Sequence, residues 1–306
     1  MPPPNRRGLL LALALLLTAG LYAQFRADTR LVVLHASVAD KHGKLLTDLK
    51  QSAFKVFENG QPQQVKIFRR EDVPVSLGLV IDDSGSMITK RARVEAAALA
   101  LVRESNPQDE VFIVNFNDDH YLDVPFTGDI HKMEQGIAKI DSRGGTAMRD
   151  AISASLDYIR ENAKKDKKVL LIITDGNDNA SNTSLEKVVG RSNQTETVIY
   201  AIGLFTEEEK HEAAKARRAL NELTSTTGGL AFYPKEVSEV QAIASEIAHD
   251  IRSQYTIAYS PTSPDDGSYR QIRVTVDGPG KPVVRTRSGY YATPEVRAKS
   301  ATAGGL

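Results

Sequence analysis

The sequence predicts an α/β protein with a mostly parallel central sheet and a β module built from strands at both ends of the chain. From Val73 onward, short apolar runs alternate with segments of helical period, which is the pattern of a parallel sheet with crossover helices. Before and after that region, apolar and polar residues alternate with a period of two, which is typical of half-buried strands.

The central region predicts five main strands and four amphipathic helices. A further short strand at 121–125 should pair antiparallel with the second strand. Ser238 and Gln241 suggest a capping box for the last helix. The main strands are expected at residues 76–81, 111–116, 169–174, 197–204 and 230–233. The apolar helix stripes are Val94, Ala98 and Leu101; Ile130, Met133, Ile137 and Ile140; Ile152, Leu156 and Ile159; and Val240, Ala244, Ile247 and Ile251.

The flanking strands include a hairpin with a strong sequence signal. Asn59-Gly60 separates the arms 54–58 and 61–68, and both turn positions tolerate a positive φ. Pro62 places the second arm at a sheet edge. Each flanking segment alone is too small to bury a face, so we expect residues 30–70 and 254–292 to pair in one sandwich. Two separate β flaps are the alternative.

The N-terminus predicts export. Arg6-Arg7 precede an apolar run at 9–17, followed by small residues, as in a secretory signal peptide. The run is short for a membrane span, which needs about 20 residues, although an uncleaved anchor is the alternative. We therefore divide the chain into a signal peptide at 1–23, N-terminal β strands at 24–72, a central domain at 73–253, C-terminal β strands at 254–293 and a flexible tail at 294–306. The mature chain is expected in the periplasm or outside the cell.

Composition excludes several kinds of function. The 306 residues contain 39 basic and 39 acidic side chains, so the overall charge gives no attraction to nucleic acid or anionic membranes. The chain has no cysteine, which excludes disulfides and thiolate metal sites.

Three segments of the central domain carry oxygen ligands. Asp82, Ser84 and Ser86 follow the first apolar strand, Thr146 follows a Gly-Gly pair, and Asp175 follows a later strand. Carboxylates and hydroxyls are hard ligands, so this set suits Mg²⁺ or Mn²⁺ better than Zn²⁺. Ligands in open α/β sheets bind outside the carboxyl ends of the strands.

These residues resemble the metal-ion-dependent adhesion site of the von Willebrand factor type A domain. The D-x-S-x-S motif of that family matches Asp82, Ser84 and Ser86, its threonine matches Thr146, and its later aspartate matches Asp175. The resemblance covers roughly residues 73 to 252. It implies a doubly wound, mostly parallel sheet with strand order 3-2-1-4-5-6, in which Asp82 and Asp175 lie next to each other.

The resemblance also implies how the site works. The hydroxyls of Ser84, Ser86 and Thr146 would contact the metal, while Asp82 and Asp175 act largely through bound waters. A cation held mainly by neutral hydroxyls keeps much of its charge, so it accepts an anionic ligand. In such domains this ligand is an Asp or Glu of a partner protein, which predicts a non-catalytic adhesion or scaffold module. Three flanking segments resemble exported bacterial proteins related to the same family: Asp72-Val-Pro-Val-Ser, residues 54–60 and Arg287-Ser-Gly-Tyr-Tyr.

One enzyme class is an alternative. Asp82-Asp83-Ser84-Gly85 resembles the D-[ST]-G signature of aspartic proteases, which would make the chain an exported hydrolase. Such an enzyme needs a second carboxylate that shares a proton, and strand–helix alternation does not suit its all-β fold. A simpler alternative is that Ser84 and Ser86 only cap the following helix. Loops around Asp118, at 142–145 and at 177–181 are the expected rim of the site, and Asp150 is expected to be structural.

Overall fold

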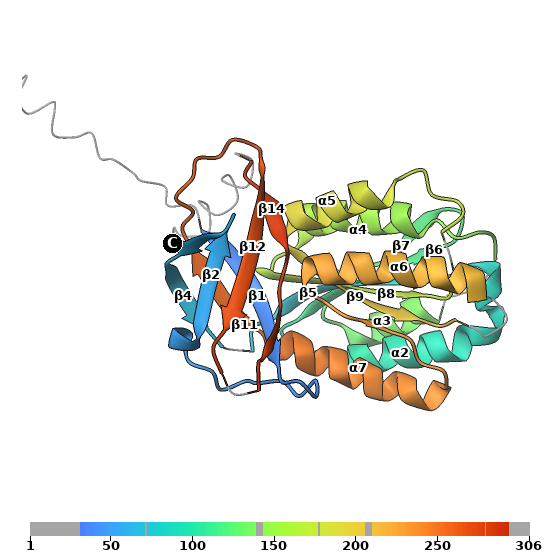
Figure 1. Ribbon diagram of the computed structural model, residues 1–306. Coiled ribbons are helices and arrows are strands. Elements are labelled where there is room, and N and C mark those ends of the chain that lie inside the picture. Colours follow the sequence, from blue (N-terminus) through green and yellow to red (C-terminus); the bar gives the residue numbers. More distant parts are fainter. Residues whose placement is uncertain are drawn as a thin grey trace, which may run out of the picture. The chain divides into compact units, whose positions relative to one another are not determined.

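The computed structural model describes residues 31–70, 72–138, 143–176, 178–205, 210–278 and 280–293 (Figure 1). The predicted signal peptide at 1–23 and the predicted tail at 294–306 lie outside these residues. Within the described ranges, no helix is both long and apolar enough to cross a membrane.

A six-stranded sheet forms the centre of the α/β domain. Its strand order is β10-β9-β8-β5-β6-β7, and every pairing is parallel except that of β6 with β7. Counted from β5, this is the expected order 3-2-1-4-5-6, so the predicted fold class is confirmed. The strands are β5 (Val75–Asp82), β6 (Glu110–Phe116), β7 (His120–Thr127), β8 (Lys167–Thr174), β9 (Thr197–Gly203) and β10 (Ala231–Phe232).

Helices cover both faces of this sheet (Figure 1). The apolar cores on the two faces are separate. The central strand β5 contributes Leu77, Leu79 and Ile81 to one of them and Val80 to the other. One face packs on α2 (Arg91–Arg103), α3 (Ile130–Ile137) and α7 (Val237–Arg252); the other packs on α4 (Met148–Asn162), α5 (Leu185–Thr195) and α6 (Lys210–Thr227).

Two details of the predicted helices are wrong, and a third concerns a residue that the structure does not describe. Ser238 does not cap α7, because the helix begins at Val237 and its N-cap residue is Glu236. Ile130 is 44% exposed, because it is the first residue of α3 and lies beyond the packed stripe. Ile140 lies outside the described residues.

The flanking strands form two four-stranded sheets with the orders β13-β1-β11-β4 and β14-β12-β2-β3. Each sheet combines N-terminal and C-terminal strands, and one apolar cluster fills the space between them. The flanking β module is therefore confirmed, and its two segments pair as one sandwich. Its strands are β1 (Val32–Ala39), β2 (Phe54–Glu58), β3 (Gln61–Gln63), β4 (Val65–Arg69), β11 (Tyr255–Tyr259), β12 (Tyr269–Val276), β13 (Val283–Arg285) and β14 (Gly289–Tyr291).

The predicted hairpin is present, but its second arm differs from the expectation. Asn59 and Gly60 have φ values of 48° and 79°, as the turn requires. After Gln64 the chain leaves β2 and pairs with β11 in the other sheet, so one predicted strand becomes β3 and β4. Pro62 lies on β3, which is an edge strand as predicted. The break at Gln64 lets the same run of residues contribute to both sheets.

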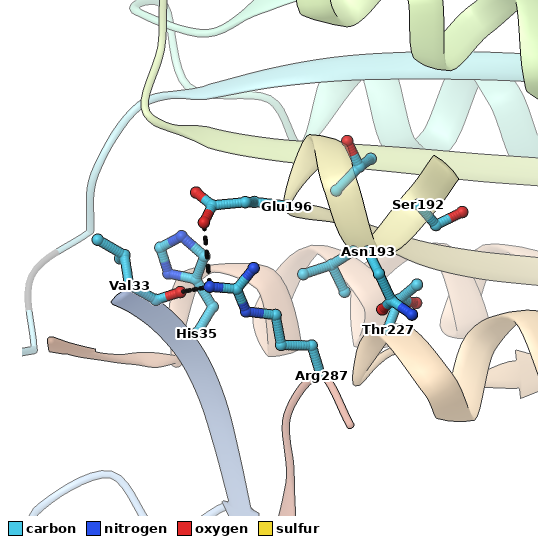
Figure 2. Close-up of a pocket in the computed structure, with 9 residues that line it drawn as sticks. Val33, His35, Ser192, Asn193, Glu196, Thr227 and Arg287 are labelled. Carbon is cyan, nitrogen blue, oxygen red and sulfur yellow. Dashed lines mark hydrogen bonds and ion pairs between the residues drawn. The ribbon is translucent and has the colours of Figure 1, made fainter. Parts of the chain in front are cut away.

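His35 on β1 lines a small hollow beside α5, close to Arg287 and Glu196 (Figure 2). The Arg287 guanidinium donates to the Val33 carbonyl oxygen (2.8 Å) and the Glu196 carboxylate (3.0 Å). Burial, reinforced by the charges of Lys167, Arg287 and Lys168, lowers the pKa of His35 to about 3. The imidazole is therefore neutral in the folded protein at every pH near neutrality.

We predict that the free energy of unfolding falls as the pH drops below about 6.5, because the unfolded chain then binds a proton at His35 that the folded chain excludes. Between pH 7 and pH 5, His35 should account for a loss of about 1 to 2 kcal/mol. Urea unfolding of wild type and His35→Gln at both pH values measures this contribution. The variant should lose less stability over that interval, and equal losses would contradict the prediction.

Candidate functional site

The two aspartates lie at the carboxyl edge of the central sheet. β5 and β8 are parallel neighbours with Ile81 opposite Ile173, so Asp82 ends one strand and Asp175 directly follows the other. Both are buried, with exposed fractions of 0% and 3%. The structure thus brings together two carboxylates that are separated by 93 positions in the sequence.

Ser84 and Ser86 connect these carboxylates. The Ser84 amide donates to Asp82 Oδ1 (2.9 Å), and the two serine hydroxyl oxygens are 3.1 Å apart. The Ser86 hydroxyl donates to Asp175 Oδ1 (2.8 Å). Ser84 is the N-cap residue of the short 3-10 helix η3 (Gly85–Lys90), but its side chain makes no capping hydrogen bond. Helix capping therefore does not explain why the Ser84 hydroxyl lies here.

Thr146 reaches the same place from the loop before α4. A Cβ atom added to Gly176 would lie 3.3 Å from Thr146 Oγ1 and 3.9 Å from Asp82 Oδ2, so both oxygens border the space beside Gly176. The Thr146 amide donates to Asn179 Oδ1 (2.9 Å). Its hydroxyl makes no hydrogen bond to another residue in the described part of the chain, which leaves that oxygen available to a ligand.

Glycine is required in the loop that presents Thr146. Gly144 has a φ of 75°, and an added Cβ there would lie 2.3 Å from Asp118 Oδ2. The Gly145 amide donates to Asp118 Oδ1 (2.9 Å). Asp118 thus fixes the Gly-Gly segment next to the site.

The remaining rim residues hold the loops together. The Asp178 carboxylate accepts hydrogen bonds from the Arg149 amide (2.7 Å) and guanidinium (2.9 Å). Asp150 accepts from the Asn182 (2.8 Å) and Thr183 (2.9 Å) amides, as expected of a structural residue. Ser142 and Asn177, which belong to the expected rim, lie outside the described residues.

Sequence reasoning missed two residues that contact the aspartates. The Thr174 hydroxyl donates to Asp82 Oδ2, and the Lys90 ammonium pairs with Asp175 Oδ2. Thr174 is the last residue of β8 and Lys90 is the last residue of η3, and neither residue type by itself indicates a contact with a buried carboxylate. The only available signal was their position in the sequence. Thr174 directly precedes Asp175, and Lys90 follows Ser86 by four residues.

Burial makes the charge of Asp82 costly. It raises the pKa of this carboxyl to about 6, the Asp175 charge adds to the rise, and hydrogen bonds from Ser84 and Thr174 oppose it. A nearby cation would stabilise the ionised form.

The donor set fits a hard divalent cation. Two carboxylates and three hydroxyls from three chain segments supply only oxygen, the ligand type preferred by Mg²⁺ and Mn²⁺. In the described ranges, no group of three or more His, Cys, Asp or Glu side chains is placed to hold a metal. Any metal at this edge would therefore depend on the hydroxyls.

Residues 77–177 match the family described as von Willebrand factor type A domain. This range includes all five predicted site residues. The chain contains a von Willebrand factor type A domain. No curated protein matches the chain.

Several solved structures resemble the chain at low sequence identity. Proximal thread matrix protein 1 from the mussel byssus is 16% identical, with a TM-score of 0.50 over 63% of this chain and 50% of that one. BatB from Bacteroides thetaiotaomicron is 17% identical, with a TM-score of 0.48 over 57% and 98%. The von Willebrand factor domain of the type V pili tip protein Mfa5 from Porphyromonas gingivalis is 13% identical, with a TM-score of 0.47 over 59% and 95%. At such identities the likeness concerns the fold alone.

The type A fold also bears on the protease alternative. An aspartic protease is built from β strands, whereas Asp82 here ends the parallel strand β5 of an α/β sheet, and Asp83 directly follows it. The domain family instead supports a protein-interaction module.

We predict that Thr174→Val lowers the free energy of unfolding by about 1 to 3 kcal/mol in EDTA, because the buried Asp82 carboxylate loses a donor. Thr275→Val is the matched control, since Thr275 lies on β12 and its hydroxyl makes no hydrogen bond to a described residue. Urea denaturation of both variants measures the difference. Equal stabilities of the two variants would show that the Thr174 hydroxyl does not support Asp82.

Proposed function

We propose that this chain is an exported, non-catalytic protein-binding module that holds one Mg²⁺ or Mn²⁺ and through it binds an Asp or Glu side chain of a partner. The convergence of Asp82, Ser84, Ser86, Thr146 and Asp175 at the carboxyl ends of β5 and β8 carries this proposal. Export rests on the sequence pattern at 1–23.

Each side chain has a distinct part in the proposed site. The hydroxyls of Ser84, Ser86 and Thr146 would be the direct ligands, while Asp82 and Asp175 balance charge and orient the serines through hydrogen bonds. A bound divalent cation would supply a positive charge that accepts a carboxylate oxygen. Because the hydroxyls are neutral, they leave more of that charge available than carboxylate ligands would.

The surface around the site would supply most of the partner contact. A single carboxylate bond gives modest affinity, and stable protein interfaces bury about 800 Å² on each side. Ile88 lies two residues after Ser86 on η3, and 64% of it is exposed. We expect Ile88 to supply apolar contacts to a partner segment, and the loops at Asp118 and Gly144-Gly145 to supply polar ones.

We predict that the purified protein binds one Mn²⁺ per chain and that Ser86→Ala lowers the affinity at least about tenfold, because a ligand and a bond to Asp175 are both lost. Titration calorimetry measures the Mn²⁺ affinity and stoichiometry of wild type and of Ser86→Ala. Ser245→Ala is the control, since this serine lies on α7 and contacts Glu104. Unchanged affinity in Ser86→Ala would remove this residue from the site, and no binding by wild type would refute the metal proposal.

We further predict that capture of the partner from an extract of the cell envelope disappears with EDTA and returns with Mg²⁺. Ser84→Ala should lose capture while keeping the circular dichroism spectrum of wild type, because only the site is altered. Capture that persists in EDTA would place the binding surface elsewhere. Metal-dependent cleavage of a peptide that Asp83→Asn abolishes would favour the protease alternative.

A further inference from the structure

Lys90 is a buried cation inside the proposed metal site. Its exposed fraction is 5%, and its ammonium pairs with Asp175 Oδ2. The other oxygen of this carboxylate, Oδ1, accepts the Ser86 hydroxyl. Asp175 is therefore held between a side chain of the proposed ligand set and an internal positive charge.

The short helix η3 directs Lys90 inward. A 3-10 helix has three residues per turn, so Met87 and Lys90 lie on one side, in line with Ser84 at the N-cap. Met87 and Lys90 are the buried residues of η3, whereas Ile88 between them is exposed. The turn that presents the two serines therefore also directs the Lys90 side chain toward Asp175.

Local rules of helix stability do not favour a lysine here. Lys90 is the N-cap residue of α2, where the helix dipole repels a cation, and it makes no capping hydrogen bond. Lysine is also rarely buried unless it is paired. Residues that break local rules in this way concentrate at functional sites.

The ammonium changes the charge that a metal would meet. Asp82 and Asp175 carry two negative charges when ionised, and Lys90 reduces their sum to one. In the metal-free protein, Lys90 thereby offsets part of the negative charge of the buried carboxylates. Its own positive charge also repels an incoming divalent cation.

We propose that Lys90 is an internal counter-ion that keeps the site assembled without metal and lowers its affinity for divalent cations. This inference rests on the proposed metal-binding function. Binding and release of metal would then leave the surrounding loops in place, because one of the two strand-end carboxylates keeps a cationic partner in either state.

The test compares wild type, Lys90→Met, Lys90→Arg and Lys132→Met. Methionine keeps the aliphatic stem of Lys90 without its charge, and arginine keeps the charge. Lys132 is an exposed lysine on α3, so its substitution reports the general effect of removing one positive charge. Titration calorimetry with Mn²⁺ and thermal unfolding in EDTA are measured on these four proteins, and thermal unfolding in EDTA also on the double variant Lys90→Met/Asp175→Asn.

In EDTA, Lys90→Met should lower Tm by about 5 °C or more, because the buried Asp175 loses its partner. Adding Asp175→Asn to Lys90→Met should restore most of that loss, because no unpaired charge then remains. With Mn²⁺, Lys90→Met should bind about tenfold or more tightly than wild type. Lys90→Arg and Lys132→Met should bind within about threefold of wild type.

The outcomes separate this inference from the function on which it rests. Equal Mn²⁺ affinity of wild type and Lys90→Met would overturn the role of Lys90 while leaving the metal site intact. A Tm loss that Asp175→Asn fails to restore would also overturn it. If neither wild type nor Lys90→Met binds Mn²⁺, the metal site itself is refuted. If Lys90→Met is too unstable to titrate with Mn²⁺, the Tm of Lys90→Met compared with that of the double variant in EDTA still tests the pairing of Lys90 with Asp175.

Discussion

The register between β5 and β8 is the constraint on which the rest of the site depends. Ile81 lies opposite Ile173, so the residues that follow both strands emerge at one edge of the sheet. Gly78 fixes this register, because a Cβ there would lie 2.4 Å from side-chain atoms of both Leu170 and Phe112. A slip by one residue would bring a leucine into a space that admits only glycine. The burial that stabilises the sheet thus also brings Asp82 and Asp175 together.

Polar side chains, rather than helix caps, then build the loops around this edge. Asp118 holds Gly145, and Asn179 holds Thr146, each through a backbone amide. Asp178 in turn holds Arg149 at the start of α4. These bonds order three loops before any ligand arrives, so binding does not have to order them. The side chains that surround the site therefore contribute to function by preorganisation, although none of them is a proposed ligand.

The buried pair of Lys90 and Asp175 shows how stability and function are coupled here. Two ionised carboxylates in a buried crevice are unfavourable, as the raised pKa of Asp82 indicates. A lysine from the adjacent helical turn offsets part of that cost in the metal-free protein. The same lysine stands at the start of α2, where it opposes the helix dipole. Local helix stability is thus reduced at the position where the site needs a charge.

Much of this protein could be predicted from its sequence, because the signals concerned are local. Alternating apolar runs and helical stripes predicted the α/β domain, Asn59-Gly60 predicted the hairpin, and the motif at Asp82 pointed to an oxygen-rich site. The tertiary structure decided what depends on distant segments meeting. The arm after Pro62 divides between two sheets because β2 and β11, far apart in sequence, both need a partner strand. Thr174 and Lys90 carry no local signal, since each gains its role only when β8 lies beside β5 and buries the carboxylates that they contact.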